Sequence, residues 1–199
     1  MQIDLTDHLK CLEPHDESFL VLLTGQMIGR RVIMGHLGCP VCGKEVKIRN
    51  GVVRFVERDP GDEYSTLTPE GTAAFLGLGG PGGWVALAGS AAGLARDLAP
   101  LLPGVQLVAV NPPTRAEQDD AASVILAPRI PLRSGSMRGV VVGADLARAS
   151  DWVADAVRIV LPGLRVVVEA PAPPLPPDGV EMLASAPGCW VGKKGSGKR

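Results

Sequence analysis

Four residues near the amino end of the chain constrain its fold more than any other feature. Cys39 and Cys42 form a Cys-x2-Cys pair followed by Gly43, and Cys11 and His15 form a Cys-x3-His pair upstream. Two thiolates separated by two residues can bind one metal ion, and a tetrahedral structural zinc site needs four ligands. The spacing therefore predicts a zinc site with Cys11, His15, Cys39 and Cys42 as its ligands.

The identity of the fourth ligand and the chemistry of the pair both have alternatives. His36 lies close to the second pair and could take the place of His15. A Cys-x2-Cys pair can also be redox-active or simply buried, but a redox pair normally opens a helix within a βαβ unit. The flanking segments here are typical of strands, which favours structural zinc. Elsewhere, we expect His8 to be solvated and Cys189 to be a small core residue.

The segments around the two pairs predict a zinc ribbon over residues 1–57. Each pair is followed by a hairpin of two strand-like runs. The first hairpin is expected to turn at Gly25, and Asn50-Gly51 is a strong signal for a tight turn in the second. The four expected strands are 18–24, 31–34, 45–48 and 52–56.

Residues 66–199 predict a second, α/β domain. Apolar runs interleaved with amphipathic stretches are typical of a parallel sheet covered by helices on both faces. Expected strands are 84–88, 106–110, 123–126, 139–142 and 165–169, with helices from Thr68 and over 91–102 and 150–161, and a closing hairpin of 180–183 and 189–192. The fold class is therefore α/β: a small β-rich zinc ribbon followed by a reduced Rossmann-like sheet.

Composition limits the partners and the location of the chain. The net charge is −1 and aromatic residues make up 4% of the sequence, so binding to nucleic acid is not expected. A zinc-ribbon adaptor that contacts nucleic acid is accordingly disfavoured. The amino end lacks the pattern of a signal peptide, and no apolar run approaches the ~20 residues that span a bilayer. These features predict a cytoplasmic protein without a membrane span, in which thiols stay reduced.

Three stretches of the second domain carry a family resemblance. They are 84–93, 130–142 and 156–168. These stretches resemble, respectively, the first strand and glycine loop, the Leu-Pro-Phe segment with the fourth strand, and the Pro-Gly turn with the fifth strand of class I S-adenosylmethionine-dependent methyltransferases. The likeness is to small-molecule methylases of the quinone-biosynthesis type, some of which carry an amino-terminal zinc ribbon. It covers about residues 66 to 192 and places the family's cofactor pocket at Gly89, Ser90 and Asn111.

The same resemblance implies four acidic residues that the sequence lacks. The family's acids fall here on Ala86, Asn111, Leu126 and Arg138. A hydrogen bond to a charged acceptor is worth ~1.5–3 kcal/mol, so their joint loss implies that S-adenosylmethionine is not bound and that the pocket is vestigial. Asp145 is the single candidate for a general base, and a surface or helix-capping role is preferred for it.

The expected function follows from these losses. We expect a methyltransferase-like pseudoenzyme with no catalytic residues and with zinc as its structural cofactor. It would act as a structural, accessory or assembly subunit that binds one or more proteins within a larger complex. The alternative is an active S-adenosylmethionine-dependent methyltransferase of a small molecule with an atypical cofactor site.

Overall fold

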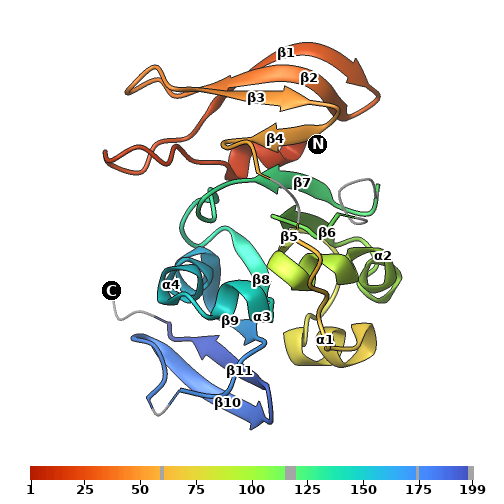
Figure 1. Cartoon of the computed structure of the whole chain (residues 1–199), viewed down its shortest axis with the longest axis vertical. Helices are drawn as coiled ribbons and strands as arrows, with labels where there is room; N and C mark the ends of the chain where they lie inside the picture. Colours follow the sequence, from red (N-terminus) through yellow and green to blue (C-terminus); the bar gives the residue numbers. More distant parts are fainter. Residues whose placement is uncertain (59–60, 115–119, 174, 197–199) are drawn as a thin grey trace.

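One sheet runs through the whole protein. The computed structural model describes residues 1–58, 61–114, 120–173 and 175–196. The described strands are β1 (Val21–Ile28), β2 (Arg31–Gly38), β3 (Glu45–Arg49), β4 (Val52–Arg54), β5 (Trp84–Ala88), β6 (Gln106–Val110), β7 (Ser123–Leu126), β8 (Met137–Val142), β9 (Val160–Val168), β10 (Val180–Ala186) and β11 (Cys189–Lys194). They form a single 11-stranded sheet in the order β1-β2-β3-β4-β7-β6-β5-β8-β9-β11-β10 (Figure 1).

The helices are short and lie on both faces of this sheet (Figure 1). They are α1 (Pro69–Leu76), α2 (Ala95–Leu98), α3 (Ala144–Ala147) and α4 (Ser150–Ile159), with 3-10 turns η1 (Ile3–His8), η2 (Gly89–Leu94) and η3 (Ala99–Leu101). The predicted start of α1 is confirmed, because Thr68 Oγ1 accepts a hydrogen bond from the N–H of Gly71. None of the helices in the described part of the chain has the length and apolar character needed to cross a membrane.

The four amino-terminal strands, where the sequence predicts a zinc ribbon, and the Rossmann-like strands are joined edge to edge. Strands β1 to β4 pair antiparallel in chain order, and β4 then pairs parallel with β7. The expected boundary between residues 57 and 66 therefore lies in a connection, while the sheet itself continues across both parts. One hydrophobic cluster likewise includes Leu37 and Val46 of the ribbon together with Val108 and Trp152 of the second part.

The second part has a doubly wound order. Strands β7-β6-β5-β8-β9 are parallel, which corresponds to the order 3-2-1-4-5 of Rossmann-like sheets. The antiparallel hairpin of β10 and β11 extends the sheet beyond β9. The α/β fold class, the Rossmann-like sheet and the closing hairpin expected from the sequence are thus confirmed.

Successive side chains along the parallel strands point to opposite faces of the sheet, and each face has its own hydrophobic core. Ala86 and Ala88 face the cluster that contains α4, whereas Val85 and Leu87 face the cluster that contains α1 and α2. Because both faces are buried, the strands are apolar at every position, as expected for a sheet covered on two sides.

Two local predictions were wrong. The first hairpin turns at Gly29, whose φ of 58° suits glycine, and Gly25 instead lies at an irregularity within β1. The helix expected over 150–161 ends at Ile159, and Pro162 and Gly163 lie inside β9. A register shift between β8 and β9 accommodates them, so the Pro-Gly pair marks a bulged strand instead of the stop of a helix.

Candidate metal centre and candidate cofactor edge

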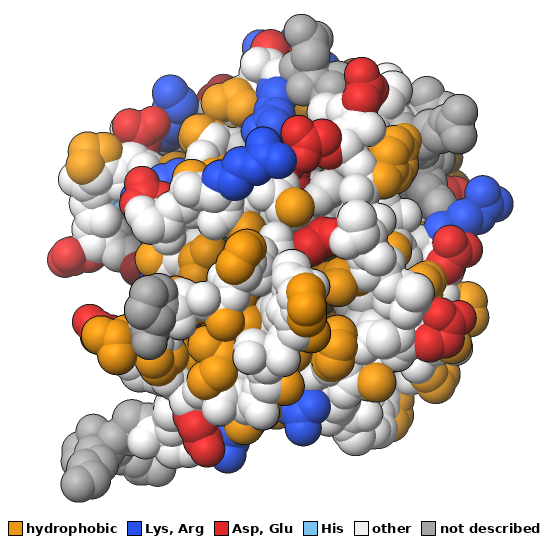
Figure 2. Space-filling model, turned by 60° about the horizontal axis from the view of Figure 1, so that its bottom comes forward, with side chains coloured by type: hydrophobic (Ala, Val, Ile, Leu, Met, Phe, Trp, Pro, Cys, Tyr) orange, Lys and Arg blue, Asp and Glu red, His pale blue; other side chains and the backbone are white. Residues whose placement is uncertain are grey.

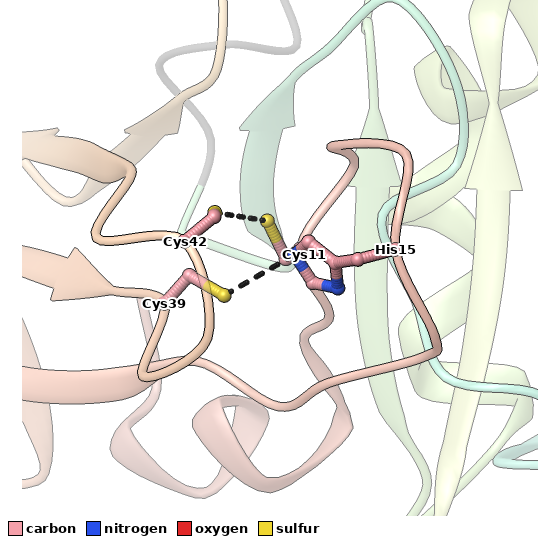
Figure 3. Close-up of side chains that lie close together, drawn as sticks. All are labelled: Cys11, His15, Cys39 and Cys42. Carbon is pink, nitrogen blue, oxygen red and sulfur yellow. Dashed lines mark hydrogen bonds between the residues drawn. The ribbon is translucent and has the colours of Figure 1, made fainter.

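The four predicted ligands converge on one point. Figure 3 shows Cys11 and His15, from the loop after η1, pointing toward Cys39 and Cys42, from the turn after β2. Their ligand atoms all lie within 4.8 Å of one another. The Sγ atoms of Cys11 and Cys42 are 3.7 Å apart, and Cys39 Sγ is 3.4 Å from His15 Nε2. Ligand atoms around a tetrahedral zinc ion are roughly 3.5–3.8 Å apart, so this group could hold zinc.

Local backbone geometry shapes the second pair. Gly43 adopts φ 72°, a left-handed conformation that glycine reaches without steric penalty. Its N–H donates to the carbonyl of Cys39, and the N–H of Cys39 donates to the carbonyl of Lys44. This closed turn directs both thiols to the same side of the backbone.

His15 presents the correct nitrogen to the centre. Its Nδ1 lies 2.7 Å from the carbonyl oxygen of Asp16. Because a carbonyl oxygen only accepts hydrogen bonds, Nδ1 carries the proton and the lone pair of Nε2 is free to bind a metal. His36 lies on the outer face of β2, opposite Lys47, and does not belong to the group that the structure brings together.

The thiols differ in acidity before any metal binds. Burial works to raise the pKa of Cys39, but N–H groups of Cys42 and Val41 donate toward its sulfur and lower its pKa to about 6. Burial raises the pKa of the Cys11 thiol to about 11. A zinc ion would displace the remaining thiol protons, and four protein ligands would leave no open position. Such a closed site contributes to folding and not to a reaction.

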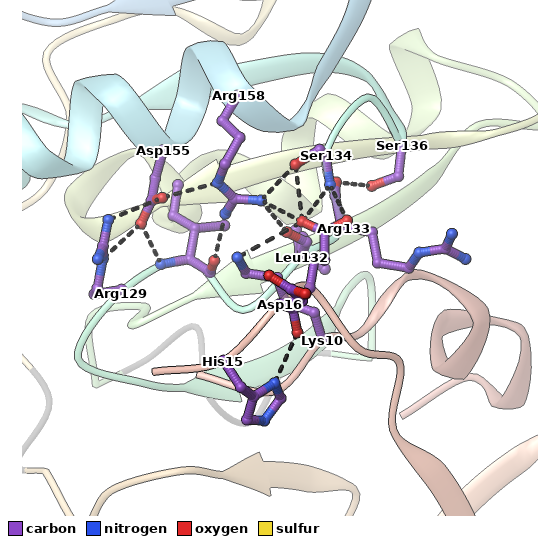
Figure 4. A network of polar contacts seen from close by, with 12 residues as sticks. Lys10, His15, Asp16, Arg129, Leu132, Arg133, Ser134, Ser136, Asp155 and Arg158 are labelled. Atoms are coloured by element: carbon purple, nitrogen blue, oxygen red, sulfur yellow. Dashed lines mark hydrogen bonds and ion pairs between the residues drawn. The ribbon is translucent and has the colours of Figure 1, made fainter. Parts of the chain in front are cut away.

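Glu17, which sequence analysis did not identify, connects the loop that carries Cys11 and His15 to the second part of the chain. Its carboxylate accepts hydrogen bonds from the N–H and the hydroxyl of Ser134, at 3.1 and 2.8 Å. It also forms ion pairs with Lys10 at 3.6 Å and with Arg158 of α4 at 3.5 Å. Arg158 in turn binds Asp155, in the polar network that Figure 4 shows beside His15.

Asn111 marks the carboxyl end of β6, where the resemblance places a ribose-binding acid. Its side chain is buried, donating from Nδ2 to the carbonyl of Ala127 at 2.8 Å and accepting from the N–H of Ala127 at 3.0 Å. The amide thus continues the pairing of β6 with β7 beyond their ends. Both of its polar atoms are engaged by the backbone of the same chain.

The glycine loop after β5 also forms its contacts with a side chain of the same protein, Asp145. Gly89 has φ 64°, and a Cβ atom there would overlap the carboxylate of Asp145. Asp145 Oδ1 accepts a hydrogen bond of 2.8 Å from the N–H of Ser90, while the Ser90 hydroxyl is buried without a partner among the described residues. Asp145, at the start of α3, therefore joins the ends of β5 and β8. Ser90, the third pocket residue expected from the sequence, is buried.

The connecting segment, residues 61–67, crosses the same edge of the sheet. Glu169, just after β9, accepts hydrogen bonds of 2.6 Å from both the N–H and the hydroxyl of Thr66, and one of 2.8 Å from Ser65. At the other end, the carbonyl of Gly61 accepts from the N–H of Thr114, beyond β6. The segment is therefore anchored at both sides of the point where the strand order reverses, between β5 and β8.

Tyr64 lies in the middle of the connecting segment. A Cβ atom added to Gly93 would be 3.1 Å from the Tyr64 ring, so the ring packs against η2. Neighbouring Glu63 pairs with Arg148 at 3.4 Å. Ligands of doubly wound sheets bind outside the carboxyl ends at the switch point, and in this protein the connecting segment lies there.

The remaining family positions are buried or bind backbone. Ala86 and Leu126 are 0% and 1% exposed within β5 and β7. Arg138 lies near the start of β8, and its guanidinium donates to the carbonyls of the loop Gly79–Gly82. None of these three side chains offers a carboxylate to a ligand.

A separate pocket of about 370 Å³ lies at the amino ends of β6 and β7. Gln106 and Ser123, the first residues of these strands, line it together with Arg31 and Asp120, which form an ion pair. Because this is the opposite end of the strands from the switch point, the pocket is not a candidate for the cofactor.

Comparisons with known proteins were made for sequence and for structure. No protein-family model matches the chain. No curated protein matches it either. Among solved structures, a putative methyltransferase from an antibiotic biosynthesis pathway of Anabaena variabilis is similar at 20% identity and a TM-score of 0.37. That match covers 50% of this chain, which spans only 43% of the length of that protein.

Two further structures are similar. The antibiotic-resistance methyltransferase Kmr has 16% identity and a TM-score of 0.44, over 70% of this chain and 98% of Kmr. Phospholethanolamine N-methyltransferase 2 of Haemonchus contortus, whose structure contains S-adenosylhomocysteine, has 16% identity and a TM-score of 0.38, over 51% of this chain and 28% of that protein. Because these similarities are low, the assignment of the fold rests on the strand order of the chain itself.

Proposed function

We propose that the chain is a non-catalytic, methyltransferase-like protein, built on a structural zinc site, that serves as an accessory or assembly subunit for other proteins. It would use no S-adenosylmethionine and would have no catalytic residues. A cytoplasmic setting, in which the zinc-binding thiols remain reduced, belongs to the same proposal.

The proposal rests mainly on the two hydrogen bonds between the Asn111 side chain and the backbone of Ala127. A ribose-binding carboxylate must present two free acceptor oxygens, whereas Asn111 has one oxygen and one NH2 group, both bonded to Ala127. Freeing the amide for a ligand would leave buried backbone groups of Ala127 without partners, which costs about 1–3 kcal/mol for each group. The position is therefore better suited to holding two strands together than to binding a sugar.

Asp145 and the connecting segment support the same conclusion. The N–H of Ser90, which lies in the glycine loop, already donates to Asp145. The connecting segment is bonded to Glu169 and Thr114 on either side of the switch point. A cofactor bound at the glycine loop and the switch point would compete with these interactions.

The alternative of an active methyltransferase with an atypical cofactor site has one observation in its favour. Gly89 keeps a positive φ of 64° at the end of β5, a conformation that permits close approach of backbone to a ligand. In that case Asp145 would have to turn away from Ser90 before the cofactor bound.

Activity measurements separate the two functions. Zinc-loaded protein is incubated with S-adenosylmethionine and a small-molecule extract of its native cells, and S-adenosylhomocysteine is quantified by mass spectrometry. We expect no release above the rate without protein. Release that depends on the folded protein, and is absent after the protein has been heat-denatured, would establish the active alternative. Tagged protein purified from its native cells should, in addition, carry stoichiometric partner chains.

A further inference from the structure

Strand β1 forms an open edge of the sheet and carries no charge. Among the described strands it pairs with β2 alone, and β1 is the terminal strand of the order. Residues 18–29 contain no Asp, Glu, Lys or Arg. Natural edge strands are usually protected from pairing by charged side chains, proline or short length. This edge has none of those features over Val21–Thr24, before the irregularity at Gly25.

The same edge exposes large apolar side chains. Val21 is 52% exposed, Leu23 70% and Ile28 64%. Met34 of the neighbouring strand β2 is 50% exposed. Val21 and Leu23 alternate with the less exposed Leu22, so they lie on one face of the sheet. An apolar, unpaired strand of this kind offers both backbone hydrogen bonds and side-chain contacts to another strand.

The opposite edge differs in its charge. Figure 2 views the molecule from the end that carries β10, where apolar side chains gather in the middle of the face and charged ones lie around them. Within β10, Leu183 is the large exposed apolar residue, at 42%, and Glu181 is paired with Lys193 of β11 at 4.0 Å. A charged residue on an edge strand disfavours pairing with a further strand. The feature is therefore specific to β1.

We propose that two copies of this chain associate through their β1 strands, in antiparallel pairing across a twofold axis, so that the two sheets become continuous. Identical strands bring no like charges together here because the strand is uncharged. With the axis at Leu22, Val21 of one copy lies opposite Leu23 of the other, and apolar pairs of this kind stabilise antiparallel strands. The interface is the same patch on both copies, so it closes at the dimer.

The chemistry of the edge favours a second copy over other occupants. A nucleic acid would need cationic side chains, and β1 has none. A second copy supplies a strand of the same length and apolar character, and the pairing brings no charged residue of 18–29 against another. The inference rests on the sheet edge and does not depend on the proposed function.

Sedimentation equilibrium of the full, zinc-loaded chain tests the dimer. The wild-type protein is expected to be a dimer that dissociates on dilution. A Leu23→Lys variant should raise the dissociation constant about tenfold or more, because each interface gains two like charges. The matched control is Leu183→Lys on β10, which should leave the dissociation constant unchanged. Because Leu23 is 70% exposed, the variant should retain the near-ultraviolet circular dichroism of the wild type.

Two results would overturn the proposed dimer. A wild-type chain that remains monomeric up to about 100 μM would overturn the proposal, since affinity weaker than that corresponds to less than about 5.5 kcal/mol. A Leu23→Lys dimer as tight as the wild type would also overturn it, because the interface would then lie elsewhere. Should Leu23→Lys fail to fold, Thr24→Lys on the same edge serves as the second variant. Neither result bears on methyl transfer, which is measured separately.

Discussion

Side chains at the carboxyl edge are engaged by the backbone of their own chain, and Asn111 is the clearest case. It also adopts a positive φ of 53°, which asparagine tolerates better than most residues. Asn50 shares this conformation, with φ 51°, but lies exposed in a turn. The two positions therefore separate the effect of backbone conformation from the effect of the buried hydrogen bonds.

We predict that Asn111→Asp lowers the free energy of unfolding by about 2–4 kcal/mol. A carboxylate cannot donate to the carbonyl of Ala127, and a buried charge beside that oxygen is unfavourable. Asn50→Asp, as the matched control, should change stability by no more than about 0.5 kcal/mol. Urea denaturation measures both. Equal effects of the two substitutions would mean that the Ala127 bonds contribute nothing.

His8 is half-buried, contrary to the expectation that it is solvated. Its ring lies 6.0 Å from that of Trp84 in an edge-to-face arrangement. Burial lowers the pKa of His8 below 6.5; Asp7 and Asp4 oppose that shift, and Arg133 adds to it. A lowered folded-state pKa means that the unfolded chain binds more protons between the folded pKa and 6.5.

Stability should therefore rise with pH through that window, and the His8 contribution should be constant above about pH 6.5. We predict that His8→Gln removes this part of the pH dependence. Free energies of unfolding measured by denaturant titration at several pH values below and above 6.5 check the prediction. An unchanged slope in the variant would contradict it.

At the scale of elements, what could be predicted from the sequence was local. The bounds of β5, β6 and β7 were predicted to the residue, because continuous apolar runs between turn signals are typical of buried strands. The segment expected to be one helix over 91–102 is instead η2, α2 and η3, and Pro100, which has no backbone donor, lies within η3. The pairing of β4 with β7 joins residues about 70 positions apart, and no local pattern encodes it.

In the candidate site, too, only the features that depend on local spacing could be predicted from the sequence. Spacing alone identified the four residues that the structure brings together, because the approach of the two thiols in Cys-x2-Cys depends on neighbours in sequence. No sequence pattern pointed to Glu17 or Glu169, because each forms its hydrogen bonds with residues far away in the chain. The sequence offers Asp145 as a candidate base or helix cap, but no sequence pattern predicts its bond to Ser90.

Gly89 and Asp145 should behave as a coupled pair. Gly89→Ala introduces a left-handed alanine, at about 1–2 kcal/mol, together with an overlap with the Asp145 carboxylate. Gly29→Ala, with φ 58° and no atom within 4 Å of the new Cβ, should show the backbone effect alone. In an Asp145→Ala background the Gly89 substitution should fall to the Gly29 value. Thermal denaturation of the four variants measures this coupling, and simple additivity would contradict it.

At the scale of the whole molecule, the Cys/His group and the Rossmann-like strands belong to one structure. Cys11 and Cys39 lie in the same hydrophobic cluster as Trp84 and Trp152. The ribbon strands continue into the parallel sheet through β4 and β7. Loss of the metal should therefore affect both parts of the chain together.

We predict that removing zinc with a chelator, or a Cys39→Ser/Cys42→Ser double substitution, destabilises the entire protein in one transition. Structural zinc contributes free energy of folding directly, and a shared core transmits its loss. Tryptophan fluorescence and far-ultraviolet circular dichroism should report coincident midpoints, while metal analysis of the native protein should give one zinc per chain. Two separate transitions, or native stability in the chelator, would contradict the prediction.

We propose that residues of the protein itself occupy the carboxyl edge of the sheet. Calorimetric titration of the zinc-loaded protein with S-adenosylmethionine tests that claim most directly. We predict no binding with a dissociation constant below about 100 μM, which corresponds to roughly −5.5 kcal/mol. Tighter, saturable binding with one site per chain would show that Asn111, Asp145 and the connecting segment leave room for the cofactor, and would contradict the account.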